Sequence, residues 1–354
     1  MTPSRKVRVL IVEDSPVVQQ LLTHIVAEDP RLEVAAVATT GEEALRLAER
    51  LKPDVVSLDI RLPGIDGFEV TKRLMRHHPV PIVVVAADVD DLDIPMRALQ
   101  AGALAVVEKP VGMARAEYQS VAQRLCSQLY GMSQVKVIRQ RIDRFPLRGT
   151  AETQPAPPIL SGMRYAALGL VASTGGPPAL VKVLNGLPAD FPMPIFLVQH
   201  IGAQFVAGFA TWLQSVCPLP VTLARTGVKP LPGTVHVAPG DVHLTVERDR
   251  IILTDGAMVC GQRPSGDTLF KSMAMAYGAA GVGVLLTGMG EDGARGLLEM
   301  RQAGGYTIAE HASTAVIHGM PGAAIRLGAA VEELPLPQVA PRLVALAMPQ
   351  KEGM

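Results

Sequence analysis

Three side chains of the types used in nucleophilic catalysis follow apolar runs in the second half of the chain. Ser173 follows ALGLVA, His200 follows IFLVQ, and Asp292 lies in a glycine-rich turn after VGVLL. A serine, a histidine and a carboxylate can act as nucleophile, general base and orienting group. Because such a set is defined by geometry rather than by chain order, the order Ser, His, Asp is compatible with a hydrolase.

Other interpretations of these segments remain open. A serine before Thr-Gly-Gly-Pro-Pro lies close to a helix N-terminus, which can hold phosphate, although the Lys-Ser/Thr pair of a P-loop is absent. It can also be an ordinary capping serine. The segment GMGEDG, residues 288–293, matches the glycine pattern of dinucleotide-binding turns, with Glu310 as the later acidic residue. Against that interpretation, Asp292 would place a negative charge beside a pyrophosphate.

Acidic residues and a lysine follow three apolar runs in the first half. Glu13 and Asp14 follow VRVLIV, Asp59 follows VVSL, and Lys109 follows AVVE. If these runs are parallel strands of one sheet, their side chains meet beyond the carboxyl ends of the strands. Gathered carboxylates repel one another unless a cation lies among them, and oxygen ligands suit Mg²⁺. The lysine can neutralise an incoming phosphoryl group.

Both halves alternate short β-branched runs with amphipathic windows, which is the pattern of a parallel sheet covered by helices. We therefore predict an α/β fold with two doubly wound parallel-sheet domains. The strands expected in the first half span residues 7–12, 33–38, 55–58, 82–85 and 105–107. Those expected in the second half span residues 167–172, 195–198, 221–224, 234–238, 243–247, 251–254, 282–286 and 306–309. Glycine and proline in the middle of the second set favour inserted hairpins.

A segment rich in Pro, Gly and Thr, residues 145–162, indicates an extended linker between the two halves. A charged helical stretch, about residues 116–141, precedes it. We predict a first domain over residues 1–125, a helix and Pro-rich linker over residues 126–162, and a second domain over residues 163–350.

The composition narrows the classes of function. With 48% hydrophobic and 19% charged residues, the 354-residue chain is typical of globular proteins. Its formal net charge of +0 gives no reason to expect binding to nucleic acid or to an anionic membrane. No apolar export segment or membrane-spanning run is evident, and 3 cysteines are too few for a disulfide framework. We expect a cytoplasmic protein without membrane insertion, and a monomer by default.

The motifs VLIVEDSPVVQQLL, VVSLDIRLPGIDGFEV and VVEKP resemble those of response-regulator receiver domains, over about residues 5–125. The resemblance implies a flavodoxin-like fold in which Asp59 accepts a phosphoryl group from a histidine kinase. It implies that Asp14, helped by Glu13, and the backbone carbonyl of Arg61 hold Mg²⁺ together with Asp59. Lys109 would contact the phosphoryl oxygens.

Two positions depart from the receiver pattern. Ala86 stands where the family usually has Ser or Thr, and Val106 stands where it usually has an aromatic residue. Those side chains normally carry the phosphorylation signal to the surface. We therefore expect phosphorylation of Asp59, with a signal that is weak or travels by another route.

The second half resembles the catalytic domain of the chemotaxis-specific protein-glutamate methylesterase, the CheB family, over about residues 163–345. The similar motifs are VASTGGPPAL, VQHIGAQF, PGTVHVAPGDVHL, RPSGDTLFKSMA, LLTGMGEDGARGL and VIHGMPGAA. The resemblance implies a Rossmann-like esterase domain with a hairpin insertion. It also implies hydrolysis of glutamate methyl esters on methyl-accepting chemotaxis receptors, and in some members deamidation of receptor glutamines.

The same resemblance assigns roles in the second half. Ser173 would be the nucleophile, His200 the base and Asp292 the orienting acid, with Thr174 and the Met289 backbone N–H completing the site. The ester step needs no metal or organic cofactor, so Mg²⁺ belongs to the receiver.

The CheB resemblance has one clear departure, and one alternative function remains. Glu310, His311 and Ala312 stand where relatives usually have Gln-Asp-Glu, which would alter the fit of the receptor. The alternative is a non-catalytic two-component signalling module that only docks partners.

Overall fold

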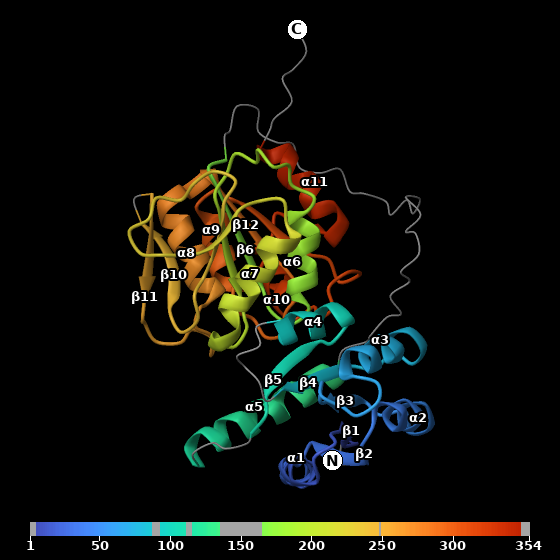
Figure 1. Cartoon of the computed structure of the whole chain (residues 1–354). Coiled ribbons are helices and arrows are strands. Elements are labelled where there is room, and N and C mark those ends of the chain that lie inside the picture. The colour runs from blue at the N-terminus through green and yellow to red at the C-terminus, as the bar shows by residue number, and fades with distance from the viewer. Residues whose placement is uncertain (1–4, 87–92, 111–114, 135–164, 248, 348–354) are drawn as a thin grey trace. The chain divides into compact units, whose positions relative to one another are not determined.

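The computed structural model describes residues 5–86, 93–110, 115–134, 165–247 and 249–347. The chain divides into two compact units, Met1–Pro146 and Leu147–Met354, which are described separately. Each unit consists of helices packed on a parallel sheet (Figure 1), so the predicted fold class is confirmed.

The first unit contains a five-stranded sheet in the order β2-β1-β3-β4-β5, with every neighbouring pair parallel. The central strands β1, β3 and β4 are almost wholly buried, as expected for strands covered by helices on both faces. The strands are β1 (Val7–Val12), β2 (Leu32–Ala38), β3 (Val55–Leu58), β4 (Ile82–Ala86) and β5 (Ala105–Glu108).

The helices of the first unit form two groups. Helix α1 contacts α5, whereas α2 contacts α3 and α3 contacts α4. Helix α5 continues beyond residue 125, and its buried side chains Leu129 and Met132 belong to the core of this unit. The predicted helical stretch beyond residue 134 lies outside the described residues. The helices are α1 (Pro16–Glu28), α2 (Gly41–Leu51), α3 (Gly67–His77), α4 (Asp93–Ala101) and α5 (Arg115–Ser133).

The second unit contains a seven-stranded parallel sheet in the order β14-β13-β12-β6-β7-β9-β8, and a separate antiparallel hairpin, β10-β11. Buried apolar side chains, including Phe196 and Leu285 on the strands and Phe270 on a covering helix, form a core cluster on one face of the sheet. The sheet strands are β6 (Ala167–Ala172), β7 (Ile195–Gln199), β8 (Val221–Leu223), β9 (Val235–Val237), β12 (Gly281–Leu285), β13 (Tyr306–Glu310) and β14 (Glu332–Leu334), and the hairpin strands are β10 (His243–Glu247) and β11 (Arg250–Thr254).

The helices of the second unit connect these strands and cover the sheet (Figure 1). Helices α8 and α9 pack against each other, and α8 also supports the β10 strand of the hairpin. The helices are α6 (Gly176–Leu184), α7 (Val206–Val216), α8 (Gly266–Tyr277), α9 (Ala294–Gln302), α10 (Met320–Arg326) and α11 (Leu336–Ala347), with short 3-10 turns η1 (Ala203–Phe205) and η2 (Gly278–Ala280).

The structure differs from the sequence prediction at two places in the second unit. Only residues 243–254 form the inserted hairpin, because β8 and β9 instead pair in parallel with the main sheet. The short edge strand β14, Glu332–Leu334, was not predicted. Its two glutamates interrupt the apolar pattern by which the other strands are recognised.

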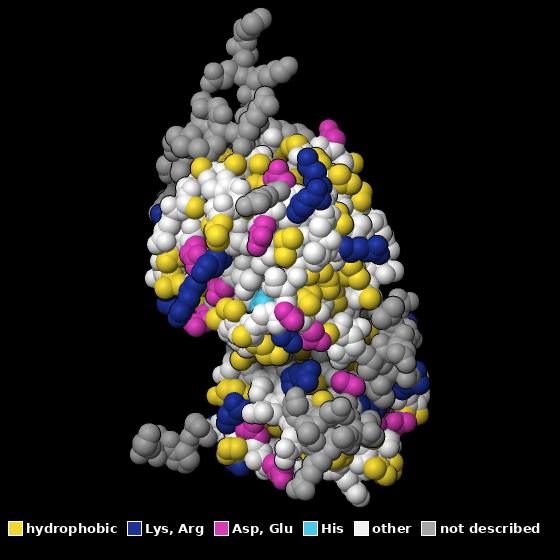
Figure 2. Space-filling view, turned by 90° about the vertical axis from the view of Figure 1, so that its left-hand side faces the viewer, with side chains coloured by type: hydrophobic (Ala, Val, Ile, Leu, Met, Phe, Trp, Pro, Cys, Tyr) yellow, Lys and Arg dark blue, Asp and Glu magenta, His cyan; other side chains and the backbone are white. Residues whose placement is uncertain are grey.

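The surface carries charges of both signs without a large patch of one sign on the face that Figure 2 shows. Lysine and arginine side chains alternate there with aspartate and glutamate. This distribution agrees with a net charge of +0 and gives no basic stripe on that face for a nucleic acid. Among the described residues, no helix combines the length and apolar character needed to cross a bilayer.

Candidate functional site

The strands that lead to Ser173, His200 and Asp292 are neighbours in the sheet. Strand β6 lies between β12 and β7, with parallel pairing on both sides. The backbone continues this order beyond the strand ends, because Ser173 N donates to Thr287 O at 3.0 Å and His200 N donates to Ala172 O at 3.0 Å. The three predicted residues therefore emerge at one edge of one sheet, where ligand sites form in α/β folds.

The two glycines after Ser173 allow a tight turn from β6 into α6. Gly175 has a φ of +76°, a backbone conformation that disfavours other residues. A side chain at Gly176 would overlap with Gln199 and come within 2.8 Å of the Ala172 Cβ atom. The Gln199 amide uses this space to donate to the carbonyl of Ser173 at 2.8 Å. The turn thus fixes the Ser173 backbone while its side chain remains partly exposed.

A third glycine brings the end of β12 against the serine. A Cβ atom on Gly288 would lie 2.7 Å from the Cβ of Ser173, closer than two carbon atoms can approach. The preceding residue ties the two loops together, because Thr287 Oγ1 donates to the carbonyl of Thr174 at 2.9 Å. The backbone after β12 therefore lies directly beside Ser173.

His200 and Asp292 form a close, buried pair of side chains. His200 Nε2 lies 2.8 Å from Asp292 Oδ2, and the two side chains are 6% and 3% exposed. The ring N–H does not point along this line, so the pair lacks an aligned hydrogen bond, which is common in catalytic sites without substrate. His200 Nδ1 is buried and has no hydrogen-bond partner among the described residues. With Nε2 facing the acid, Nδ1 is the nitrogen that can accept a proton.

The carboxylate of Asp292 is surrounded by donors from the start of helix α8. Ser265 Oγ donates to Oδ1 at 2.6 Å, the Gly266 N–H donates to Oδ2 at 2.6 Å, and the Asp267 N–H donates to Oδ1 at 3.2 Å. Burial alone would raise the pKa of Asp292, but the His200 imidazole, the Ser265 hydroxyl and the Gly266 N–H outweigh burial and lower it. Asp292 is therefore a carboxylate that can orient and stabilise a charged imidazole.

The residues that hold Asp292 were not predicted from the sequence. The only local signal was a serine before an apolar helical window, which is typical of a helix N-cap. That signal predicts where α8 begins, but not that this end faces Asp292, which lies 27 positions after Ser265.

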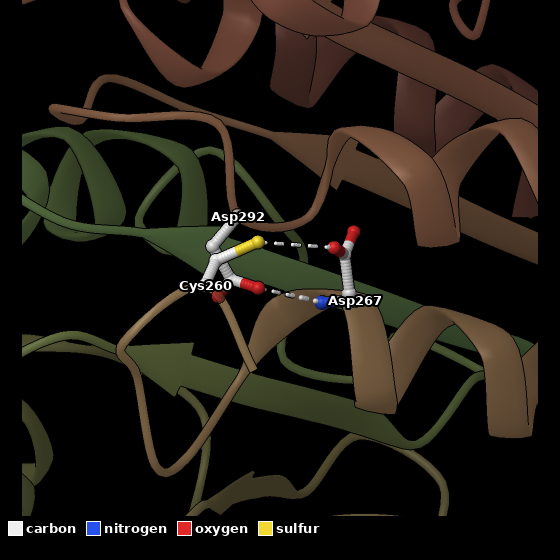
Figure 3. Close-up of side chains that lie close together, drawn as sticks. All are labelled: Cys260, Asp267 and Asp292. Carbon is white, nitrogen blue, oxygen red and sulfur yellow. Dashed lines mark hydrogen bonds between the residues drawn. The ribbon is translucent and has the colours of Figure 1, made fainter. Parts of the chain in front are cut away.

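Asp267, Asp292 and Cys260 lie close together (Figure 3) and could be taken for a metal site. The Asp267 carboxylate already accepts from the Gly296 N–H at 2.8 Å and faces the Cys260 thiol at 3.7 Å. The Asp292 carboxylate is occupied by the three α8 donors. Since these carboxylates are already hydrogen-bonded, the cluster is explained by helix capping and not by a metal ion.

Glu310, the acidic residue of the dinucleotide interpretation, is fully buried at the end of β13. Its Oε2 accepts from the Thr287 N–H at 2.8 Å, and its Oε1 accepts from Thr314 Oγ1 at 3.0 Å. Both oxygens are thus engaged inside the protein and are not available to a ribose hydroxyl. This geometry argues against a dinucleotide site at residues 288–293.

Replacing Glu310 by glutamine is expected to make the second unit less sensitive to rising pH. Burial raises the pKa of Glu310 above 4.5, although the Thr287 N–H and Thr314 hydroxyl oppose the shift. Between pH 4.5 and this raised pKa the folded protein binds more protons than the unfolded chain, so the wild type loses stability as pH rises through that window. Glutamine removes that loss and can make both hydrogen bonds.

The expected gain for Glu310→Gln is about 2–4 °C in Tm at pH 8, the shift that about 1 kcal/mol produces in a domain of this size. The gain should shrink towards pH 4, as measured by thermal unfolding across that range. The exposed Glu247→Gln change on β10 is the control and should show no such trend. A Tm difference that is the same at both pH values would contradict the prediction.

The first unit gathers its predicted acids and lysine at the carboxyl ends of β1, β3 and β5. Lys109 Nζ lies 2.7 Å from Asp59 Oδ2 and 2.8 Å from Glu13 Oε2, and all three side chains are buried. Burial alone would lower the pKa of Lys109, but its two carboxylate partners outweigh burial and raise it. The lysine is therefore a cation placed beside Asp59.

The same cluster fits Mg²⁺. Oxygen atoms of Glu13, Asp14 and Asp59 lie within 4.8 Å of one another, and Arg61 lines the same cavity of about 270 Å³. Burial raises the pKa of Glu13, and the nearby Asp59 charge adds to this, so a cation would stabilise the ionised pair. An all-oxygen set is the donor chemistry that Mg²⁺ prefers.

Comparison with known proteins identifies both units. The family model described as response regulator receiver domain matches residues 9–118, and the one described as CheB methylesterase matches residues 168–343. The chain is 53% identical to protein-glutamate methylesterase/protein-glutamine glutaminase 2 of Paramagnetospirillum magneticum, over 97% of this chain and 98% of the relative. The chain belongs to the CheB methylesterase family.

Further comparisons agree with membership in the CheB family. Protein-glutamate methylesterase/protein-glutamine glutaminase 3 of Anaeromyxobacter dehalogenans is 45% identical, over 95% of this chain and 98% of the relative. The crystal structure of the Thermotoga maritima CheB methylesterase catalytic domain is 34% identical and has a TM-score of 0.50, covering 51% of this chain and 98% of that chain. Membership in the CheB family favours the regulated hydrolase over the non-catalytic docking module.

Two further residues carried over from the CheB resemblance lie on the loops beside Ser173. Thr174 follows the serine directly, and its carbonyl accepts the Thr287 hydroxyl. Met289 follows Gly288 and is 47% exposed. Their role in completing an oxyanion site stays a prediction.

Proposed function

We propose that the second unit, over residues 163–350, hydrolyses γ-methyl esters of glutamate side chains on methyl-accepting chemotaxis receptors and releases methanol. The observation that supports this most strongly is the buried His200–Asp292 pair, formed by residues that follow the two strands on either side of the Ser173 strand, with Nδ1 left to accept a proton. The name protein-glutamate methylesterase, which the relatives carry, agrees with a glutamate methyl ester of a protein as substrate.

The proposed reaction proceeds in two steps. The Ser173 hydroxyl attacks the ester carbonyl while His200 Nδ1 takes its proton. The protonated imidazole, stabilised by Asp292, then gives a proton to the departing methoxide, and methanol leaves behind a glutamyl ester on Ser173. A water molecule, activated by the same nitrogen, hydrolyses this ester and restores the serine.

The same steps can act on a glutamine side chain, with ammonia in place of methanol. The relatives' names include protein-glutamine glutaminase, and a serine nucleophile with a histidine acid can expel either leaving group. We therefore propose receptor glutamines as a second substrate of the same site.

We propose that the first unit, with a domain limit at residue 125, controls this activity through phosphorylation of Asp59 by a histidine kinase. Glu13, Asp14, Asp59 and the Arg61 carbonyl would hold Mg²⁺, which neutralises phosphoryl oxygens when bound. Lys109, already 2.7 Å from Asp59, would contact the transferred phosphoryl group. We further propose that the protein acts in the cytoplasm and that it is a monomer.

Methanol release from receptor-containing membranes tests this function. We expect the purified full chain to release methanol, and a small acyl phosphate with Mg²⁺ to raise the rate in the wild type but not in Asp59→Asn. The Ala86 and Val106 departures predict a modest rise. The exposed Asp66→Asn change, which keeps a capping side chain on helix α3, is the control and should respond to the acyl phosphate as the wild type does. Absence of methanol release from every methylated receptor would favour the docking module.

A further inference from the structure

We propose that Ser265 is a positioning residue that acts through Asp292, by holding the acid in the orientation that faces His200. This inference rests on the proposed function, since it concerns the acid of the proposed triad. The Ser265 side chain is fully buried and bonds to Asp292 at 2.6 Å, so it acts on the acid and not on the substrate.

The hydrogen-bond donors around the Asp292 carboxylate hold it in one orientation. Oδ1 accepts from the Ser265 hydroxyl and from the Asp267 N–H, while Oδ2 accepts from the Gly266 N–H and faces His200 Nε2. Donors on both oxygens resist rotation of the carboxylate about its Cβ–Cγ bond. Without the Ser265 hydroxyl, Oδ1 would keep only the longer bond of 3.2 Å.

Ser265 is itself fixed from its other side. Its N–H donates to His243 Nδ1 at 3.2 Å, and His243 Nε2 contacts the Ala257 carbonyl at 3.0 Å. Since a carbonyl only accepts, Nε2 carries the proton and Nδ1 is free to accept from Ser265. Both Ser265 and His243 are buried, so water does not compete for these bonds. A polar chain thus runs from His243 through Ser265 and Asp292 to His200.

The start of α8 is in turn attached to the start of α9. Asp267, in the first turn of α8, accepts from the Gly296 N–H in the first turn of α9 at 2.8 Å. Asp292, just before α9, accepts from the first N–H groups of α8. A side chain at Gly296 would lie 2.5 Å from the Asp267 carbonyl, so the two helices approach as closely as their backbones allow. Ser265 therefore has a fixed position relative to Asp292.

The test replaces Ser265 by alanine and by glycine and measures methanol release with the full chain. Both changes remove the hydroxyl, but glycine is a tolerated helix N-cap whereas alanine is not. We expect kcat to fall about 10–100-fold in both variants, the loss typical of one hydrogen bond to a charged group, with KM unchanged. A role confined to capping α8 would instead spare Ser265→Gly.

Two further variants separate positioning from general destabilisation. Ser272→Ala, on the same helix, removes an acceptor for the Val246 N–H but does not touch Asp292, and we expect its kcat to be unchanged. In an Asp292→Asn background, Ser265→Gly should cause little further loss, because its effect passes through the acid.

Three results would overturn the proposal. The first is a kcat of Ser265→Gly within twofold of wild type. The second is a kcat loss in Ser272→Ala as large as that in Ser265→Ala. The third is that Ser265→Gly lowers kcat in the Asp292→Asn background by the same factor as in the wild type. If Asp292→Asn alone leaves kcat unchanged, the proposed triad fails and the positioning role fails with it. A normal loss in Asp292→Asn with no effect of Ser265 would reject the positioning role alone.

Discussion

Changing Ser173 to alanine is expected to reduce methanol release by a factor on the order of 10⁶, the effect of removing the nucleophile of a serine triad. The change deletes one oxygen atom and leaves the backbone contacts of the turn in place, because Thr287 and Gln199 bond to the main chain of residue 173. The loss should therefore be in kcat, with little change in stability.

The measurement is methanol release from methylated receptor membranes, with thermal unfolding of each variant beside it. Ser215→Ala is a matched control, because Ser215 is exposed and its hydroxyl donates to the Trp212 carbonyl of its own helix, α7. We expect Ser215→Ala to keep wild-type turnover. Near-normal turnover in Ser173→Ala would exclude Ser173 as the nucleophile.

Changing Asp292 to asparagine is expected to lower kcat by about 10⁴-fold, the loss seen when the acid of a serine-protease triad becomes an amide. With the amide nitrogen at the Oδ2 position, the side chain would donate to His200 Nε2 and force the ring proton onto Nδ1. Nδ1 could then no longer take the serine proton. The Gly266 N–H, now 2.6 Å from Oδ2, would also lose its acceptor.

The opposite orientation of the asparagine side chain amide is also unfavourable. The amide nitrogen would then face the Asp267 N–H, which donates to Oδ1, and two donors would meet in a buried site. We therefore expect a lower Tm together with the lower kcat. The exposed Asp190→Asn change in the same unit is the control and should alter neither quantity. A kcat within tenfold of wild type would contradict the role of Asp292 as the orienting acid.

The sequence was sufficient to predict the sheet edges that carry both sites. The residues grouped from the pattern follow apolar, β-branched runs, which are recognisable because strands covered on both faces have few polar positions. Arg61, Thr174 and Met289 were predicted only from the family resemblances. For this reason Ser173, His200 and Asp292 could be grouped before any geometry was known. The same reasoning grouped Lys109 with Asp59 and Glu13.

What remained beyond prediction depends on contacts between distant segments. Whether β8 and β9 form a hairpin or join the main sheet is decided by the pairing of β9 with β7 and of β8 with β9, and local turn residues carry no information about that choice. The role of Ser265 was hidden for the same reason. A helix N-cap can be recognised locally, but the carboxylate that the helix start meets belongs to another loop.

The reciprocal attachment of α8 and α9 has a consequence for local unfolding. Helix ends normally fray independently, whereas here the first N–H groups of each helix are bound by an acid that belongs to the other. Opening either end releases a buried carboxylate and removes an acceptor from its neighbour. Amide hydrogens of Gly266 and Gly296 should therefore exchange with solvent in one shared event, and the geometry of Asp292 can be lost only together with this part of the folded core.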